Sequence, residues 1–561
     1  MSAAAKAIPT LLPIVGQQSD ERSRDLILKT SSNELVFAVV GHVGSGTGYI
    51  AKALQSLLGD ASICGEPFDV HILKARTVIE NWARKRNKPL PDFAAPRTLK
   101  NVEILQDYGD EMRGEKTASG HEDHSAVARA LVLQIRKARA RSMGLADTGP
   151  MPVELDRKKR AYIIDSLRHP EEANLLRRLY QDAFVQIGIV CEESKRRSRL
   201  GKKYGDAGTE NANKFMRRDE DASEKNGQHV GDTFYLSDFF VDNTADRKNP
   251  DGSSNRAWTI NDELSRLIKL LIGKELVRPY MSETAMHIAN SAKLRSACLS
   301  RQVGAAIVDH QGQVIATGTN EAPKAGGGVY GEQFEDEDKS FEGRCALMDD
   351  PNDRYCRNTQ QQNEIINSLI EDVPELKVLS NERKEKLAVE LRETRIGQLL
   401  EFSRAVHAEM DAILSASREG VSVVGARMFV TTFPCHYCAR HLVAAGIDEV
   451  QYIEPYPKSQ AIDLHHDSIE PEKLTSWIPP SKVTGKEDPP VRKKVLFHPF
   501  SGVAPRLYAR VFVKDRSLKD KITGKMQIGE PDWGDSWAVM SRSYIELEAK
   551  LTNEPTAPTE A

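Results

Sequence analysis

The residues best suited to chemistry in this chain are one histidine, one glutamate and two cysteines. His407, Glu409, Cys435 and Cys438 occur in the order H-x-E followed by P-C-x-x-C. Two thiolates at this spacing at the start of a helix can bind one metal ion, and a histidine nitrogen can supply the third ligand. Three protein ligands leave the fourth tetrahedral position for water, which is typical of a catalytic site. We therefore predict one Zn²⁺ ion held by the histidine and both cysteines.

Glu409 lies two residues after the histidine, where a carboxylate could serve the same site. Hydrolysis at a metal centre needs a group that takes a proton from the attacking water and passes it to the leaving group. On a helix that begins near His407, residue 409 lies close to the metal ligand without sharing its direction. We expect Glu409 to be the catalytic acid and base, because a structural zinc site has no use for a carboxylate there.

These residues are expected at junctions between strands and helices. A strand over residues 428–433 runs into the two cysteines, and a helical pattern over 439–445 follows them and ends at Gly446. A second helix begins near His407, and a strand over 450–453 completes a β-α-β-α-β order. A C-x-x-C pair alone is more often a redox or structural element, but the two motifs in this order favour a catalytic centre.

The two motifs together are the signature of zinc-dependent nucleobase deaminases. With the segments S-R-Q-V-G-A at 300–305, G-T-N-E-A-P at 318–323 and E-P-Y-P-K-S at 454–459, the sequence resembles the deoxycytidylate branch of the cytidine and deoxycytidylate deaminase family. The resemblance implies hydrolytic deamination of a deoxycytidine nucleotide. It also implies substrate contacts from Asn320, Arg301, Lys324, Lys458 and Ser459.

The chain has seven cysteines, an odd and sparse number that excludes a disulfide framework and favours a reducing compartment. Cys298, Cys345 and Cys356 could bind a second, structural zinc ion, but their spacing matches no familiar zinc motif. We interpret these three as buried apolar residues.

A second motif follows the apolar run at residues 35–40. Gly41 and Gly46 have the spacing of a phosphate-binding P-loop, but Thr47 and Gly48 stand where that motif has its lysine and its Ser/Thr. Backbone amides and a helix N-terminus remain to bind phosphate, so we expect nucleotide binding without phosphoryl transfer. The expected contacts are Gly41, Gly44, Gly46, Thr47 and Asp165.

The alternation of elements predicts two α/β domains. Apolar strands over 161–165 and 184–190 flank a helical stretch over 171–179, which indicates a parallel sheet. Linker-like composition at 247–255 separates this part from the next α/β pattern. We predict a P-loop nucleotide-kinase-like three-layer domain over 30–250, a linker over 251–279, a cytidine-deaminase-like α/β/α domain over 280–525 and a flexible tail over 526–561. The acidic insert at 332–350 and the charged stretch at 382–395 are interpreted as solvated.

As a whole, the arrangement resembles the two-domain bacterial antiphage dCTP deaminases. The resemblance implies conversion of dCTP to dUTP, with dCMP as a less favoured substrate, and depletion of dCTP in antiviral defence. A nucleotide effector at the first domain and an inhibitory RNA are candidate partners, and a homo-oligomer is expected.

Composition narrows the choice of function. The chain carries 78 basic and 81 acidic residues, and a net charge of −3 argues against a main role in coating nucleic acid. No apolar run approaches the roughly 18 residues that a spanning helix needs, so we expect a cytoplasmic protein without a membrane partner.

Three other functions stay open. A housekeeping dCMP deaminase of pyrimidine metabolism would use the same motifs. A nucleic-acid-editing cytidine deaminase could hold RNA or single-stranded DNA on the six basic residues between Lys195 and Lys203, although no aromatic residue for base stacking interrupts that run. A regulatory module with a purely structural zinc site is the third, and Glu409 argues against it.

Overall fold

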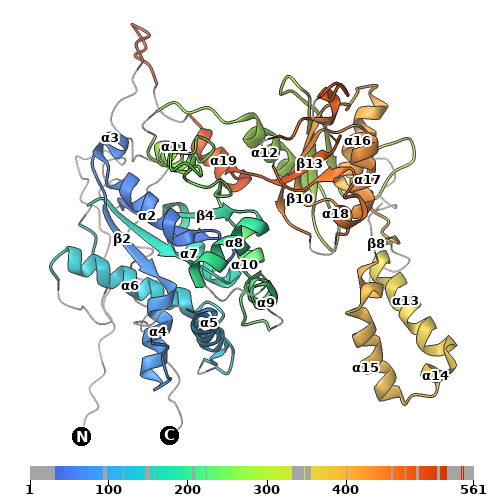
Figure 1. The fold of residues 1–561 in the computed structure, drawn as a ribbon, viewed down its shortest axis with the longest axis horizontal. Coiled ribbons are helices and arrows are strands. Elements are labelled where there is room, and N and C mark those ends of the chain that lie inside the picture. The colour runs from blue at the N-terminus through green and yellow to red at the C-terminus, as the bar shows by residue number, and fades with distance from the viewer. Residues whose placement is uncertain are drawn as a thin grey trace, which may run out of the picture.

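The computed structural model contains two α/β domains, each built on a six-stranded sheet (Figure 1). It describes residues 32–526, apart from gaps at 93–97, 118, 146–151, 157, 205–208, 221, 223, 274, 332–345, 348–354, 400, 457–458, 474–475, 488–491 and 515–517, and beyond these it describes residues 545 and 548. The predicted α/β class is confirmed for both domains. None of the helices within these residues is long and apolar enough to cross a membrane.

The first sheet has the strand order β14-β5-β4-β1-β3-β2, with parallel pairing everywhere except between β14 and β5. Every residue of β1 and β4 is buried, as expected of central strands covered on both faces. The strands are β1 (Glu34–Val40), β2 (Asp69–Lys74), β3 (Arg160–Asp165), β4 (Phe184–Val190), β5 (Phe239–Asp242) and β14 (Gly502–Val503).

Alternate residues of β1 face two different helical layers. Phe37 and Val39 pack with α2 (Thr47–Leu58) and α11 (Ile260–Ile272). Val36, Ala38 and Val40 pack with the opposite layer, because successive side chains of a strand point to opposite faces. The helices of that layer are α4 (Ala75–Lys85), α5 (Leu99–Gly114), α6 (Ala126–Ser142) and α7 (Pro170–Tyr180). Three further helices, α8 (Glu193–Tyr204), α9 (Thr209–Glu220) and α10 (Val230–Tyr235), follow β4.

The second sheet has the order β12-β13-β11-β10-β6-β7. Strand β6 pairs antiparallel with β7 and β10, and the remaining neighbours are parallel. One face packs on α12 (Met281–Lys293), and the other packs on α16 (Ala408–Arg418) and α17 (His436–Ala444). The strands are β6 (Gly304–Val308), β7 (Val314–Thr319), β10 (Arg427–Thr432), β11 (Glu449–Glu454), β12 (Ile469–Glu470) and β13 (Val495–Pro499).

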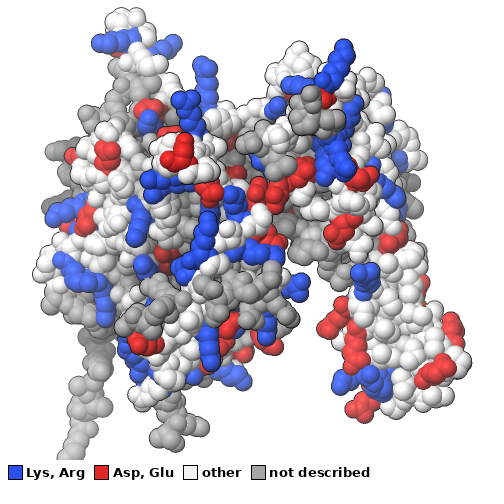
Figure 2. All heavy atoms as spheres, in the orientation of Figure 1, with Lys and Arg blue, Asp and Glu red and all other residues white. Residues whose placement is uncertain are grey.

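A helical arm extends away from the second sheet (yellow in Figure 1). It consists of α13 (Arg357–Asp372), α14 (Pro374–Lys377) and α15 (Asn381–Arg392), next to the short strands β8 (Ala346–Leu347) and β9 (Tyr355–Cys356). No residue of α15 is buried, which agrees with the prediction of a solvated charged stretch at 382–395 (Figure 2). Most of the acidic insert at 332–350 lies outside the described residues.

After β13 the chain returns to the first sheet. Gly502 and Val503 pair with β5, and Leu507 in α19 (Pro505–Phe512) packs into the core between that sheet and α11. Where the chain crosses over, the ring of Phe500 lies edge-on against Phe240, with their centroids 6.2 Å apart. The two sheets therefore share a continuous apolar core, although residues 502–512 fall inside the range predicted for the second domain alone.

The predicted tail, residues 526–561, lies mostly outside the described residues. Three of its positions are described: Met526 is exposed, whereas Ile545 and Glu548 are buried. Glu548 accepts hydrogen bonds from Arg139 at 2.7 Å and from the Tyr180 hydroxyl at 2.6 Å. These contacts attach part of the C-terminal segment to the first domain.

Candidate active site

Three predicted metal ligands meet at the N-termini of two helices. His407 is the N-cap residue of α16, Cys435 is the N-cap residue of α17, and Cys438 lies in the first turn of α17. Each cysteine Sγ lies 3.3 Å from His407 Nδ1. Tetrahedral zinc with Zn–N of about 2.0 Å and Zn–S of about 2.3 Å needs N to S separations of about 3.5 Å. Among the described residues these three form the one group that could hold a metal ion, and its donor set fits zinc.

The charge state of the thiols also suits a cation. A hydrogen bond with Cys438 lowers the pKa of the Cys435 thiol to about 4, against the opposing effect of burial. The same hydrogen bond, together with burial, raises the pKa of Cys438. The helix dipoles of α16 and α17 add positive potential at their N-termini, where the ligands lie. The pair thus offers one thiolate at neutral pH and a second thiol that a metal ion would deprotonate.

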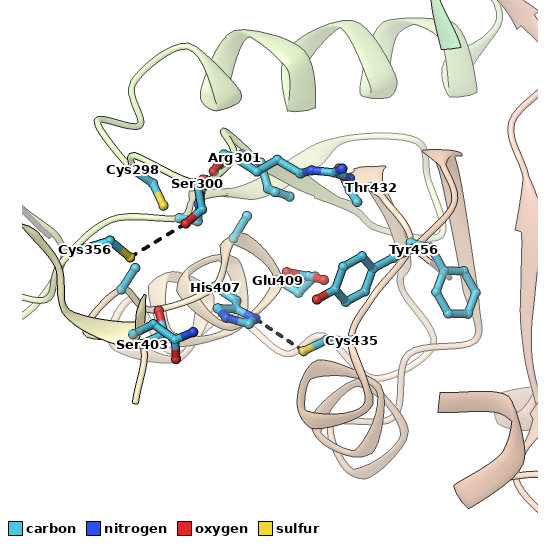
Figure 3. A pocket seen from close by; sticks show the side chains of 16 residues that line it. Cys298, Ser300, Arg301, Cys356, Ser403, His407, Glu409, Thr432, Cys435 and Tyr456 are labelled. Carbon is cyan, nitrogen blue, oxygen red and sulfur yellow. Dashed lines mark hydrogen bonds between the residues drawn. The ribbon is translucent and has the colours of Figure 1, made fainter. Parts of the chain in front are cut away.

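Glu409 lies in the first turn of α16 and points into the same pocket as His407 (Figure 3). Only 4% of the residue is exposed. Burial, followed by the charge of Cys435, raises the pKa of its carboxyl group to about 7. A carboxyl group with this pKa can both accept and donate a proton near neutral pH, as an acid–base catalyst must.

His407, Cys435 and Glu409 line a pocket of about 290 Å³. Aromatic rings of Phe433 and Tyr456 lie on its wall, and Figure 3 shows the Tyr456 ring next to the Glu409 carboxyl group. Such rings give a planar base an apolar surface to stack on. The other lining residues are Cys298, Ser300, Arg301, Val303, Asn320, Cys356, Asn358, Ser403, Ala405, His407, Ala408, Thr432 and Cys435.

Two of the predicted substrate contacts reach this pocket. Asn320 lines it, but its amide bonds to the protein: Oδ1 accepts from the amide of Val303 at 2.6 Å, and Nδ2 donates to the carbonyl of Arg301 at 2.7 Å. Asn320 thereby positions the segment that carries Arg301. The Arg301 side chain is 50% exposed at the pocket and lies 3.3 Å from a carboxylate oxygen of Glu454.

Two other predicted substrate contacts, Lys324 and Ser459, do not line this pocket. Lys324 lines a separate hollow of about 340 Å³, together with Arg418 and the Gly327–Gly328 turn. The Ser459 hydroxyl donates to the carbonyl of Pro434 at 2.8 Å and so supports the loop before Cys435. Lys458 lies outside the described residues. The structure therefore does not place Lys324 at the pocket of the metal ligands, and its role as a substrate contact stays a prediction.

The interpretation of the extra cysteines as core residues also needs correction. Cys298 and Cys356 are partly exposed and line the pocket. Cys345 lies outside the described residues. Sequence reasoning also missed Thr432, Ser403 and Tyr456 as lining residues. Tyr456 could have been predicted as a lining residue, because it belongs to the 454–459 segment on which the resemblance rests.

The glycine loop of the first domain joins β1 to α2. Gly44 and Gly46 have φ angles of 86° and 96°, which residues with a side chain rarely adopt. A Cβ atom at Gly48 would lie 3.2 Å from Asp165 Oδ2, so the acid that ends β3 faces the first turn of α2. The structure therefore brings the predicted nucleotide contacts together at the carboxyl edge of the first sheet.

The basic run that begins at Lys195 forms α8, and much of its charge is balanced. Lys195 pairs with Asp246 at 2.8 Å, and Arg197 contacts Glu193 one turn away on the same helix. Arg196 is buried. The run therefore offers less free charge to a nucleic acid than its sequence indicates.

The second domain is similar in sequence to known proteins. Residues 279–454 match a family model described as the cytidine and deoxycytidylate deaminase zinc-binding region, and this range contains the metal ligands and Glu409. The deoxycytidylate deaminase of Enterobacteria phage T2 is 30% identical over 181 residues, which cover 32% of this chain and 82% of the relative. The match to a zinc-binding region confirms the predicted zinc cofactor.

Two solved structures show weaker likenesses. The apo dCMP deaminase of cyanophage S-TIM5 is 18% identical with a TM-score of 0.19, over 34% of this chain and 94% of that one. A gluconokinase from Sinorhizobium meliloti 1021 is 13% identical with a TM-score of 0.20, over 44% of this chain and 99% of that one.

Proposed function

The chain belongs to the cytidine and deoxycytidylate deaminase family, and from this premise we propose that it converts dCTP to dUTP, with dCMP as a secondary substrate. The observation that carries the proposal is that His407 and Cys435, which form a metal-binding group with Cys438, line the same pocket as a buried carboxyl group, Glu409. A structural zinc site would not need that carboxyl group.

Each residue of the site has a defined task in this reaction. A zinc ion held by His407, Cys435 and Cys438 would supply Lewis-acid activation of water. Glu409 takes a proton from the attacking water and delivers it to the ring nitrogen of the base. It then takes the remaining proton from the new C4 hydroxyl and passes it to the exocyclic amine, so the C4–N bond breaks, ammonia leaves and the C4 carbonyl forms. Burial of the carboxyl group keeps both of its protonation states accessible near neutral pH.

The sugar and phosphates are proposed to extend toward Arg301. This side chain is half exposed at the pocket, and Lys293 lies 3.6 Å from the same Glu454 carboxylate that Arg301 approaches. Substrate phosphates can replace Glu454 as the partner of Arg301, because a guanidinium group binds phosphate and carboxylate in the same geometry. Two cations near one carboxylate favour a substrate with several phosphate charges, which supports dCTP over dCMP.

The proposed biological role is antiviral defence in bacteria. An enzyme that consumes dCTP deprives a replicating phage of a DNA precursor, and such an activity needs control. The first domain is the proposed regulatory part, with a nucleotide bound at its glycine loop as effector. An inhibitory RNA and a homo-oligomeric assembly belong to the same proposal and rest on the resemblance to antiphage dCTP deaminases.

The experiment that tests the reaction offers the purified full-length protein dCMP, dCTP, CTP and single-stranded DNA in parallel, and measures the uracil product of each. We expect dUTP from dCTP at the highest rate. Formation of dUMP alone would favour the housekeeping reaction, and uracil in DNA would favour an editing enzyme. A His407→Ala variant should lose all activity, while the matched control His441→Ala, in the last turn of α17, should keep it.

A further inference from the structure

The glycine loop of the first domain contains the right backbone groups for an anion. Residues 41–46 connect β1 to α2, and the amides of Thr47 and Gly48 lie in the first helical turn, where a helix has no partners for them. Gly46 is the N-cap residue, and no side chain caps the helix. The loop lacks the lysine and the hydroxyl residue that usually complete such a site.

A carboxylate from a distant part of the chain contacts this loop. Asp219, in the last turn of α9, accepts a hydrogen bond from the amide of Val43 at 2.7 Å and also contacts the guanidinium group of Arg168. Only 1% of Asp219 is exposed, and burial raises the pKa of its carboxyl group. A backbone amide of a glycine loop and an arginine are the partners that a phosphate group would take here.

Arg196 brings a second cation to the same place. Its backbone oxygen would lie 2.7 Å from a Cβ atom at Gly44, so the start of α8 packs directly on the loop. The charges of Arg196 and Arg168 act with burial to lower the pKa of His42 to about 3. Arg196 also acts on the carboxyl group of Asp219. The cluster therefore contains two guanidinium groups and one carboxylate.

Several polar groups of this cluster lack a partner. Arg196 is 8% exposed, and its Nε and Nη1 atoms make no hydrogen bond to any described residue. The same holds for the hydroxyl of Ser45, which is completely buried, and for Nδ1 of His42. Buried polar groups are nearly always paired in native proteins, and an unpaired buried charge is especially unfavourable. The two guanidinium groups carry one more charge than the Asp219 carboxylate neutralises, so one further anion would balance the charge of the cluster.

We propose that residues 41–48, Arg168 and Arg196 form a binding site for a phosphate group, and that the carboxylate of Asp219 occupies this site until a phosphorylated ligand displaces it. Arg196 supplies, from α8, the cation that Thr47 does not provide in the loop. Departure of Asp219 releases the amide of Val43 and Arg168 for the ligand. Because Asp219 lies in the last turn of α9, ligand binding moves this helix away from the loop.

The ligand is a phosphate ester or anhydride, such as a nucleotide, or free phosphate. The inference rests on the proposed nucleotide-binding role of the first domain and is independent of the deamination reaction. A failure to bind phosphate would leave dCTP deamination intact. A failure to deaminate would leave the phosphate site intact, so the two proposals can be told apart.

The test measures binding of ATP and of inorganic phosphate to the full-length protein by calorimetry. Neither probe contains the cytosine base, so the pocket of the second domain does not select them. We expect Asp219→Asn to bind the probes at least about tenfold more tightly than the wild type, because the internal competitor is gone. Arg196→Gln should bind them at least about tenfold more weakly. Binding of ATP alone assigns the site to a nucleotide, and binding of both probes assigns it to the phosphate group.

The matched control is Asp107→Asn. Asp107 contacts Arg218, the neighbour of Asp219 on α9, at 2.6 Å and does not touch the loop. This variant loosens the same helix without removing the carboxylate on the loop, so its affinity for both probes should equal that of the wild type. The proposal is overturned if Asp219→Asn gains no affinity, or if Asp107→Asn gains as much.

A second measurement covers the case in which Asp219→Asn does not fold. The melting temperature of the wild-type protein should rise with added phosphate, because a ligand of the native state stabilises it. Arg196→Met should abolish this rise, and it should melt at or above the wild-type temperature without phosphate, because an apolar side chain replaces a buried guanidinium group whose Nε and Nη1 atoms lack partners among the described residues. A phosphate-induced rise of normal size in Arg196→Met would contradict the proposed site.

Discussion

Arg266 and the buried Glu283 form an ion pair that connects the two domains. The two Nη atoms of Arg266, in α11, each lie 2.7 Å from a carboxylate oxygen of Glu283, in α12. Glu283 is completely buried, and it also accepts the amide of Val503 at 2.7 Å, at the strand that returns to the first sheet. One carboxylate thus holds together a helix of the first domain, a helix of the second and the segment that crosses back.

Removal of this carboxylate should destabilise the whole chain. We expect Glu283→Ala to lower the free energy of unfolding by about 3–5 kcal/mol, because it leaves the guanidinium group of Arg266 without its buried partner. Denaturant unfolding checks this. The matched control is Glu275→Ala, which breaks the exposed pair with Lys269 and should cost less than about 1 kcal/mol. Equal effects of the two variants would show that the Arg266–Glu283 pair does not join the domains.

Glu409 should be essential for turnover but not for the fold. Glu409→Ala should reduce deamination at least about a hundredfold, because acid–base catalysis typically contributes 10²–10⁴ in rate. The zinc content and the melting temperature should stay near those of the wild type. The control is Glu401→Ala, an exposed residue that accepts a hydrogen bond from Tyr437. Near-normal turnover in the Glu409 variant would exclude the proposed proton transfer.

The metal ligands predict a defined zinc content. Elemental analysis of protein purified without chelators should find about one zinc ion per chain, because one group of three ligands is present among the described residues. Cys435→Ser should lose the metal and the activity together. Cys191→Ser, a change of the same type outside the second domain, should retain both. A wild-type protein free of zinc, or a Cys435 variant with full zinc content, would contradict the assignment.

Glu192 should make stability depend on pH. Burial, then the charges of Glu472 and Asp242, raises the pKa of its carboxyl group from 4.5 to about 7. The folded state therefore favours the protonated form, so this group's contribution to stability is complete below pH 4.5 and is lost as the pH rises through 7. We expect Glu192→Gln to show a smaller loss of melting temperature between pH 5 and pH 8 than the wild type.

The control for this prediction is Glu193→Gln. Glu193 is exposed and contacts Arg197 within α8, so its neutralisation should leave the pH profile unchanged. Parallel profiles for the wild type and Glu192→Gln would show that the carboxylates at this contact do not repel one another in the folded protein.

Part of the site could be predicted from local spacing alone. Cys435 and Cys438 could be identified because the first turn of a helix places residues three apart next to each other, and His407 could be identified from its H-x-E motif at the start of another helix, α16. Glu409 followed from the same helix. The glycine loop was identifiable for a similar reason, since positive φ angles and a following helix leave a clear pattern of residue types.

The distant residues that meet these local motifs could be identified only from the tertiary structure. Asp219 reaches the amide of Val43 from 176 positions away, and Phe500 reaches Phe240 across the boundary between the sheets. No periodicity in a single segment records such contacts, because they arise when elements from different parts of the chain pack together. For the same reason Lys324 could not be separated from the substrate pocket in advance. The direction of the chain after a turn depends on the sheet to which it returns.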